Sequence, residues 1–300
     1  MSSIEVEDFT RTARGSSAEA DIRGVSFVLH IEGKYESDNI ENVRDYIFYK
    51  NLIQSLGYSA DIRIEGNCHS LMKESLRIGG DNSTGHIFIF DRDHNEVLGT
   101  NKINSRLDFY THGYSWENDF WTTSLIKNVI DVFCSNQAAI TPLLINFKEI
   151  ENTAKEYHKI NLLSRANGRK IFDIGGSCNM PMVISRGKCS FVQDCLDRLN
   201  TIWGGFNLHD EQKTITANSF LENEYYSHPG YLIQGHSYEH LTLEFIAKHS
   251  TTLKVVSSNK VCDKDMLLSI ATRAFIRSPL TVLHPNTIEH YRRIFSTMVA

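Results

Sequence analysis

The sequence predicts an α/β protein, with a small parallel-sheet half followed by a mainly helical half. Two observations carry this prediction. Up to about residue 90, short apolar runs rich in β-branched residues alternate with segments of helical periodicity, an order typical of parallel strands joined by crossover helices. After about residue 124, the segments between loops are mostly helix-compatible.

The first half contains three predicted strands and two predicted helices. The runs VSFVLHI (25–31), SADIRI (59–64) and HIFIF (86–90) are short and apolar, as buried strands are. Segments 39–57 and 69–80 read as helices, and each ends at a glycine that favours helix termination. We therefore expect two consecutive strand–helix–strand units.

The second half is predicted to be helical. Segment 140–166 is long and helix-compatible, and further helices are expected at 189–203, 237–249, 263–276 and 286–298. The expected organisation is therefore a polar N-terminal arm (1–23), an α/β domain (24–125) and a mainly helical C-terminal region (126–300).

Composition favours a folded protein of the cytoplasm. The 300 residues carry a net charge of -5, which argues mildly against a dedicated DNA-binding protein but does not exclude a nuclease. The six cysteines show no C-x-x-C pair, as expected for reduced thiols. The sequence has neither a secretory h-region nor an apolar run of the roughly 20 residues that span a bilayer. We expect no membrane association.

Acidic residues follow two of the predicted strands. Glu32 follows the first strand, and Asp91 and Asp93 follow the third. Because ligands of parallel sheets gather beyond the carboxyl ends of the strands, we expect these carboxylates to converge. Two carboxylates at i and i+2 of an extended segment point to the same side and suit Mg²⁺, which prefers hard oxygen ligands. Glu36 can point at the same cavity, and Gly33 leaves room for a metal or phosphate.

Three segments carry a family resemblance. IEGKYESD (31–38) and FIFDRD (88–93) resemble the two signatures of the TOPRIM domain of topoisomerases, primases and OLD-family nucleases. THGYSWENDF (111–120) is similar to a group of TOPRIM-like proteins of bacterial defence loci, which includes the AriB effectors of PARIS anti-phage systems. The resemblance covers residues 25 to about 125, and beyond them only GHSYEHL (235–241).

The resemblance implies a role for each acidic position. Glu32 matches the catalytic acidic residue, and Asp91 and Asp93 match the ligands of Mg²⁺ or Mn²⁺. Glu36 matches the second acidic position of OLD-type nucleases, and Glu117 matches the glutamate of the Glu-Asn motif.

The resemblance also implies a biological setting. Effectors of this group are held inactive by a partner ABC-type ATPase and are released when a phage protein is sensed. Once released, they form homodimers and cleave RNA, with host transfer RNA as the implied target. The chain is therefore expected to be a toxic, metal-dependent endonuclease that prefers RNA to DNA.

Basic and aromatic residues supply weaker candidates for nucleic-acid binding. Lys34 lies two residues after Glu32, and Arg92 lies between Asp91 and Asp93, so we expect both near the scissile phosphate. An ordinary exposed side chain is the alternative for Lys34. A second basic set, either a phosphate-binding patch or an ordinary solvated surface, comprises Arg165, Arg169, Lys170, Arg186 and Lys188. Four aromatic residues near Glu117 are expected to pack in a core rather than stack on bases: Tyr114, Trp116, Phe120 and Trp121.

Two alternatives to the nuclease remain open. His236, Glu239 and His240 form an H-x-x-E-H pattern, whose histidines can bind zinc from one helix face with the glutamate as general base. Glu244 or Glu289 would supply the third ligand of such a metalloprotease. In the other alternative, the acidic site is catalytically silent, and the protein acts only by docking to its ATPase partner.

Overall fold

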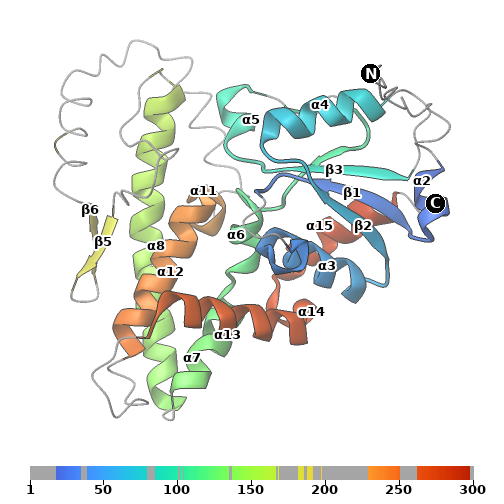
Figure 1. Cartoon of the computed structure of the whole chain (residues 1–300). Coiled ribbons are helices and arrows are strands. Elements are labelled where there is room, and N and C mark those ends of the chain that lie inside the picture. The colour runs from blue at the N-terminus through green and yellow to red at the C-terminus, as the bar shows by residue number, and fades with distance from the viewer. Residues whose placement is uncertain are drawn as a thin grey trace, which may run out of the picture. The chain divides into compact units, whose positions relative to one another are not determined.

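The computed structural model describes residues 18–34, 39–79, 85–100, 102–103, 105–134, 137–166, 168, 182–185, 188–191, 197, 229–250 and 262–297 (Figure 1). The chain divides into two units. The first comprises 1–90, 102–110 and 291–300, and the second comprises 91–101 and 111–290. Neither unit is one continuous stretch, because the chain leaves the first unit after β3 (His86–Phe90) and returns to it twice.

The first unit is built on a four-stranded parallel sheet. Its strands lie in the order β2 (Ala60–Ile64), β1 (Phe27–Ile31), β3 and β4 (Asp108–Tyr110). Every neighbouring pair is parallel. The predicted α/β fold and its three strands are confirmed, and β4 is an additional strand of three residues that its short sequence did not reveal.

Burial explains why the central strands were visible in the sequence. All five residues of β1 and all five of β3 are buried, whereas the edge strand β2 alternates between buried and half-buried residues. A strand covered on both faces is largely apolar, so it reads as a nearly continuous hydrophobic run. The two histidines inside these runs, His30 and His86, are buried as well.

Helices cover both faces of this sheet (Figure 1). On one face, α4 (Cys68–Ile78) contributes Leu71 and Ile78 to a core with Phe88 of β3. The other face is covered by α3 (Arg44–Ser55) and by the last turns of α15 (Pro285–Ser296), whose Phe295 stacks on Phe27 with ring centroids 5.2 Å apart. Asn67 caps α4 by accepting a hydrogen bond from the Ser70 amide.

Two short elements also belong to the described part of the first unit. The helix α2 (Glu19–Arg23) occupies the end of the predicted N-terminal arm. The 3-10 turn η1 (Ile40–Asn42) precedes α3, and Asn39 caps it through the Glu41 amide.

The second unit is mainly helical, as predicted. Its long helix α8 and the helices α12, α13 and α15 correspond to four predicted segments. The elements of this unit that lie in the described residues are α5 (Asn95–Leu98), α6 (Trp116–Phe120), α7 (Thr123–Phe133), α8 (Gln137–Ala166), β5 (Met182–Ser185), β6 (Lys188–Phe191), α11 (Pro229–Leu232), α12 (Gly235–Ser250), α13 (Lys264–Arg277), α14 (Pro279–Val282) and α15 as far as His290.

The predicted helix at 189–203 is wrong at its start. Residues 188–191 form β6, which pairs antiparallel with β5 in the register Met182↔Phe191. Pairing with β5 gives the β6 backbone hydrogen bonds that an isolated sequence window does not show. Within the described parts of the chain, no helix has the length and apolar character needed to cross a membrane.

Candidate metal-binding residues

Glu32 lies directly after β1 in the first unit. Its side chain is 15% exposed, and its Oε1 lies 3.6 Å from Nζ of Lys102. This ion pair holds a positive charge beside the predicted catalytic carboxylate. Lys34, two residues further on, is exposed, and Glu36 lies outside the described residues.

Gly33 is required by its surroundings. A Cβ atom at this position would lie 2.4 Å from Oδ2 of Asp45 and 3.0 Å from a methyl group of Ile64. The Gly33 amide also donates a hydrogen bond to the Gly66 carbonyl at 2.8 Å. The room beside Gly33, expected to admit a metal or phosphate, therefore adjoins the carboxylate of Asp45. No pattern in the sequence had singled out Asp45, because it lies in the first turn of α3, away from the strand ends.

Asp91 and Asp93 begin the second unit. Asp93 has a φ of 49°, in the left-handed region, which aspartate tolerates better than most residues. The expected extended backbone is therefore wrong at Asp93. The Asp93 amide donates to the Tyr114 carbonyl at 2.9 Å. Both aspartates are half-buried.

Arg92, between the two aspartates, is bound to a neighbouring loop. Its amide donates to Oγ1 of Thr111 at 3.0 Å, and its Nε donates to the Thr111 carbonyl at 3.1 Å. The predicted phosphate contact of Arg92 stays a prediction, with the Nε edge of the guanidinium already engaged. Thr111 thus joins the D-x-D segment to the start of the THGYSWEN motif.

Glu117 is buried in α6 and has two hydrogen-bonding partners. Oγ of Ser115 donates to its Oε2 at 2.6 Å, and Nδ1 of His236 lies 2.9 Å from its Oε1. Burial raises the pKa of Glu117, but the contacts with His236 and Ser115 outweigh it, so the pKa lies below the ordinary value. Glu117 is therefore held as a carboxylate.

The THGYSWENDF segment (111–120) contacts GHSYEHL (235–241) and the residues just before it, close to Glu117. Nδ2 of Asn118 donates to the carbonyls of Gly230 and, at 2.8 Å, Ile233. A Cβ atom on Gly235 would lie 1.9 Å from Oγ of Ser115 and 2.8 Å from Oε2 of Glu117, so only glycine fits there. Sequence reasoning had noted GHSYEHL but had not paired its first histidine with Glu117.

The residues of the H-x-x-E-H pattern have separate partners. The side chain of His236 is 75% exposed and contacts Glu117. Glu239 is buried and accepts a hydrogen bond from Nε1 of Trp121 at 3.1 Å. Nε2 of His240 lies 3.5 Å from Glu244. Among the described residues, the one cluster of three possible metal ligands is His30, Glu65 and Glu74. It contains neither His236 nor His240.

Tyr114 also joins the two motifs. Its hydroxyl accepts a hydrogen bond from Nε2 of Gln234 at 2.9 Å. Burial and the nearby charge of Asp93 raise the pKa of Tyr114 well above its usual value, so the phenol stays protonated. Tyr114 and the other three aromatic residues of this region are all buried. The packing interpretation of these rings is confirmed.

The remaining predicted basic residues form no group of side chains that the structure describes. Arg169, Lys170 and Arg186 lie outside the described residues, and for Lys188 only the backbone in β6 is described. Arg165, at the end of α8, is half-buried.

The predicted ligands therefore fall into two subsets. Glu32 belongs to the first unit, whereas Asp91, Asp93 and Glu117 belong to the second. The fold is that of an α/β protein with a small parallel sheet and a mainly helical C-terminal part. No protein-family model matches the sequence, and comparison with characterised proteins finds none similar to it.

Proposed function

We propose that this chain is a metal-dependent endonuclease of the TOPRIM type that uses Mg²⁺ or Mn²⁺. Glu32, Glu36, Asp91 and Asp93 would hold the metal, with Glu117 close to them. In this proposal the protein is the toxic effector of a bacterial anti-phage system. It cleaves RNA, with host transfer RNA as the favoured target, after release from an ABC-type ATPase partner.

One observation carries the proposal: the register of β1 and β3. The strands are adjacent and parallel, with Ile31 opposite Ile89. Glu32 directly follows β1, and Asp91 directly follows β3. Parallel strands end at the same edge of a sheet, where ligands of such folds bind. The order of the chain thus supplies carboxylates from neighbouring strand ends.

The chemistry of these side chains suits a hard divalent cation. Carboxylate oxygens are the ligands that Mg²⁺ prefers, and bound Mg²⁺ would supply charge for the developing phosphodiester transition state. Lys102 keeps the Glu32 carboxylate in place through its ion pair. Lys34 is exposed and is available to bind a substrate phosphate.

Three parts of the proposal rest on the resemblance of the sequence motifs to defence effectors. They are the preference for RNA, the ATPase partner and the homodimer. The contacts of the second unit support grouping these motifs, because Asp93 and Gln234 both bind Tyr114. The contact between Glu117 and His236 joins the same two sequence segments, 111–120 and 235–241. A carboxylate that fixes the ring of an exposed histidine is an arrangement suited to proton transfer.

A second candidate is a catalytically silent docking module. The observation that favours it is that two of the proposed acidic residues have partners within the chain. Lys102 pairs with Glu32, and His236 pairs with Glu117. In a docking module these pairs are permanent, and the protein acts only by binding its ATPase partner.

The deciding experiment compares Glu32→Ala with Glu41→Ala. Glu41 is a matched control, because it is an exposed glutamate of the same unit, paired with Lys50 at 3.1 Å. Each variant is expressed with the neighbouring ATPase gene and a phage trigger, and growth and transfer-RNA integrity are measured. We expect Glu32→Ala to reduce RNA cleavage about 10²-fold or more and to relieve toxicity, whereas Glu41→Ala behaves as wild type.

The opposite outcome is equally informative. If Glu32→Ala and wild type are equally toxic, or equally silent while the ATPase still binds, the nuclease proposal fails. Such a result would favour the docking module.

A further inference from the structure

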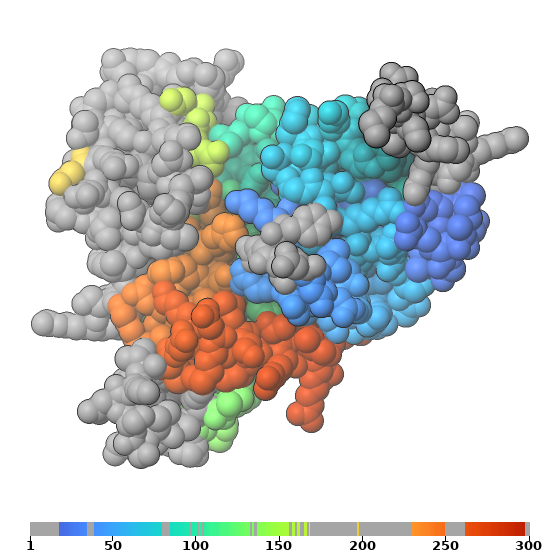
Figure 2. Space-filling view, viewed as in Figure 1, coloured from blue at the N-terminus to red at the C-terminus, as the bar shows by residue number. Residues whose placement is uncertain are grey.

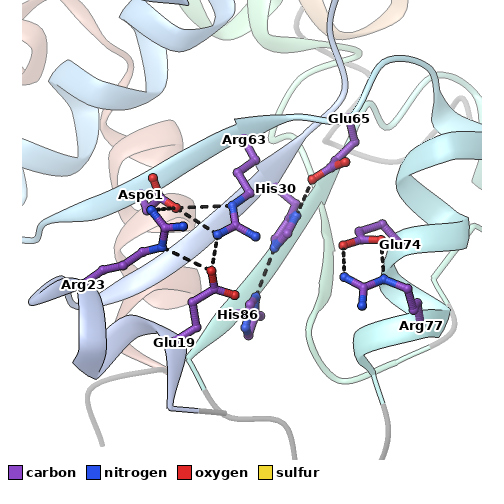
Figure 3. Close-up of polar contacts among 9 residues, drawn as sticks. All are labelled: Glu19, Arg23, His30, Asp61, Arg63, Glu65, Glu74, Arg77 and His86. Carbon is purple, nitrogen blue, oxygen red and sulfur yellow. Dashed lines mark hydrogen bonds and ion pairs between the residues drawn. The ribbon is translucent and has the colours of Figure 1, made fainter. Parts of the chain in front are cut away.

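A fully buried histidine on β1 is linked to two other ionisable side chains. Nδ1 of His30 lies 2.6 Å from Oε1 of Glu65, and Nε2 lies 3.0 Å from Nδ1 of His86 (Figure 3). The His30 ring also stacks on Phe88, with centroids 4.4 Å apart. Both ring nitrogens and one ring face are therefore fixed, and this histidine has a single orientation.

Glu74 of α4 completes a group of three possible metal ligands. One ligand atom each from His30, Glu65 and Glu74 lie within 4.8 Å of one another. The glutamate side chains are 23% and 22% exposed, so they remain open to solvent while His30 is not. The outer side of α4 forms part of the face shown in Figure 2. A cation can therefore approach from solvent on the carboxylate side.

We propose that His30, Glu65 and Glu74 bind a divalent transition metal, and that Zn²⁺ is the ion the group fits best. Imidazole nitrogen is a good ligand for zinc and a poor one for Mg²⁺. One nitrogen and two oxygens leave the fourth position of a tetrahedral site for water. None of these three residues is among the acidic residues of the proposed nuclease, so the inference does not depend on the activity of those residues.

The distances require only small movements. With metal–ligand bonds of about 2.0–2.2 Å, tetrahedral ligand atoms lie roughly 3.4 Å apart. The 2.6 Å contact between His30 and Glu65 must therefore open by less than about 1 Å. Glu65, which follows β2 directly, and Glu74, on a helix surface, reach this spacing by side-chain rotation.

His86 acts as the outer partner of this site. A metal on Nδ1 of His30 requires the neutral ring to carry its single proton on Nε2, so that proton moves from one ring nitrogen to the other and none is lost. The Nε2–H then donates to Nδ1 of His86, 3.0 Å away, and His86 carries its own proton on Nε2. Metal-binding histidines commonly donate their second N–H to such a partner, which fixes the ring and the tautomer.

Neighbouring arginines determine the charge of the site. Arg77 binds Glu74, with Nε 2.7 Å from Oε2, so a metal must compete with it. Arg63, in contrast, is held by Glu19 and by Asp61, the latter at 3.1 Å (Figure 3). Because Arg63 is paired with Glu19 and Asp61, it does not compete for Glu65. The Glu65 carboxylate can therefore bind His30 or a metal.

Metal titration of the full chain tests this inference. Co²⁺ serves as the visible probe, since tetrahedral Co²⁺ absorbs strongly between about 500 and 700 nm in zinc-type sites, and Zn²⁺ affinity follows from its displacement. We expect Glu65→Gln and Glu74→Gln to weaken Co²⁺ binding at least about tenfold. Glu41→Gln, in which the exposed partner of Lys50 is replaced, should bind as wild type does.

Arg77→Gln gives a second, opposite test. Removing the competing arginine frees Glu74, so metal binding should become tighter. Glutamine replaces each glutamate without a change of volume, and thermal unfolding of each apo variant controls for loss of the fold.

Three results would overturn the inference: no Co²⁺ binding by the wild-type chain, unchanged affinity in Glu65→Gln and Glu74→Gln, or weaker affinity in Arg77→Gln. A loss of Co²⁺ binding confined to Glu32→Gln would instead assign the ion to the proposed nuclease site. Failure of the zinc site therefore leaves the nuclease test unaffected.

Discussion

Two histidine–glutamate pairs, His30–Glu65 in the first unit and His236–Glu117 in the second, have opposite patterns of burial. In the first unit, His30 is fully buried and its partner Glu65 is 23% exposed. In the second unit, Glu117 is buried and the side chain of His236 is 75% exposed. The same two residue types therefore present different groups to solvent: a carboxylate in the first unit and an imidazole in the second.

Burial decides which member of each pair is fixed. The ring of His30 is held by His86 and Phe88, so an incoming cation meets a preformed nitrogen ligand. The carboxylate of Glu117 is held by Ser115, so it orients the exposed ring of His236. The first arrangement suits metal binding, and the second suits proton transfer to or from a bound molecule.

The largest expected effect comes from removing each histidine. His30→Ala removes a fully buried ring and leaves a cavity, which should reduce the free energy of unfolding by about 2–5 kcal/mol. His236→Ala removes an exposed ring and one hydrogen bond to Glu117, with an expected cost of about 1–3 kcal/mol. Urea unfolding of both variants at neutral pH measures the difference. An equal or larger cost for His236→Ala would break the comparison.

Glu151 sharpens the comparison, because it is a buried glutamate that accepts a hydrogen bond from a tyrosine rather than a histidine. Burial raises the pKa of Glu151 to about 7, and the hydrogen bond from the Tyr238 hydroxyl opposes this only in part. The folded state therefore binds the carboxyl proton more tightly than the unfolded state does.

The raised pKa of Glu151 makes the free energy of unfolding fall as the pH rises. The stabilisation by protonated Glu151 is fully present below about pH 4.5 and is lost as the pH rises through about 7, a loss of roughly 3 kcal/mol in the free energy of unfolding. Glu151→Gln should remove this loss, so the variant gains stability relative to wild type between pH 5 and pH 8. Urea unfolding at both pH values tests it, and a constant difference between the two proteins would contradict the raised pKa.

The smallest expected effect concerns the close approach of α12 to Glu117. Gly235→Ala places a methyl group 1.9 Å from Oγ of Ser115, and such overpacking costs about 1–3 kcal/mol. The same substitution in a Ser115→Ala background should cost less, because the nearest atom is gone. A double-mutant cycle by thermal unfolding measures this coupling. Additive effects would show that α12 moves away without disturbing Glu117.

Sequence periodicity was sufficient for most of the first unit. The runs at 25–31, 59–64 and 86–90 became β1, β2 and β3, because strands buried on both faces consist largely of apolar residues. The strand β4 was missed, since three residues carry no periodic signal. The start of the helix expected at 189–203 was wrong, because pairing with β5 determines the conformation of β6.

The candidate site was predictable only in part. The positions of Glu32 and Asp91 after neighbouring strands follow from strand order and parallel pairing. The left-handed backbone of Asp93 does not, because it depends on the hydrogen bond that its amide donates to Tyr114. The contact between Lys102 and Glu32 was likewise absent from any local pattern.

By itself, the sequence determined most of the strands and helices and which residue types can carry chemistry, because these depend largely on neighbours within one or two turns of the chain. The tertiary structure alone decided the pairs. It brought His30 to Glu65, 35 residues away, and Glu117 to His236 in a different helix. The physical reason is that a buried polar group must find a partner wherever the packed chain supplies one.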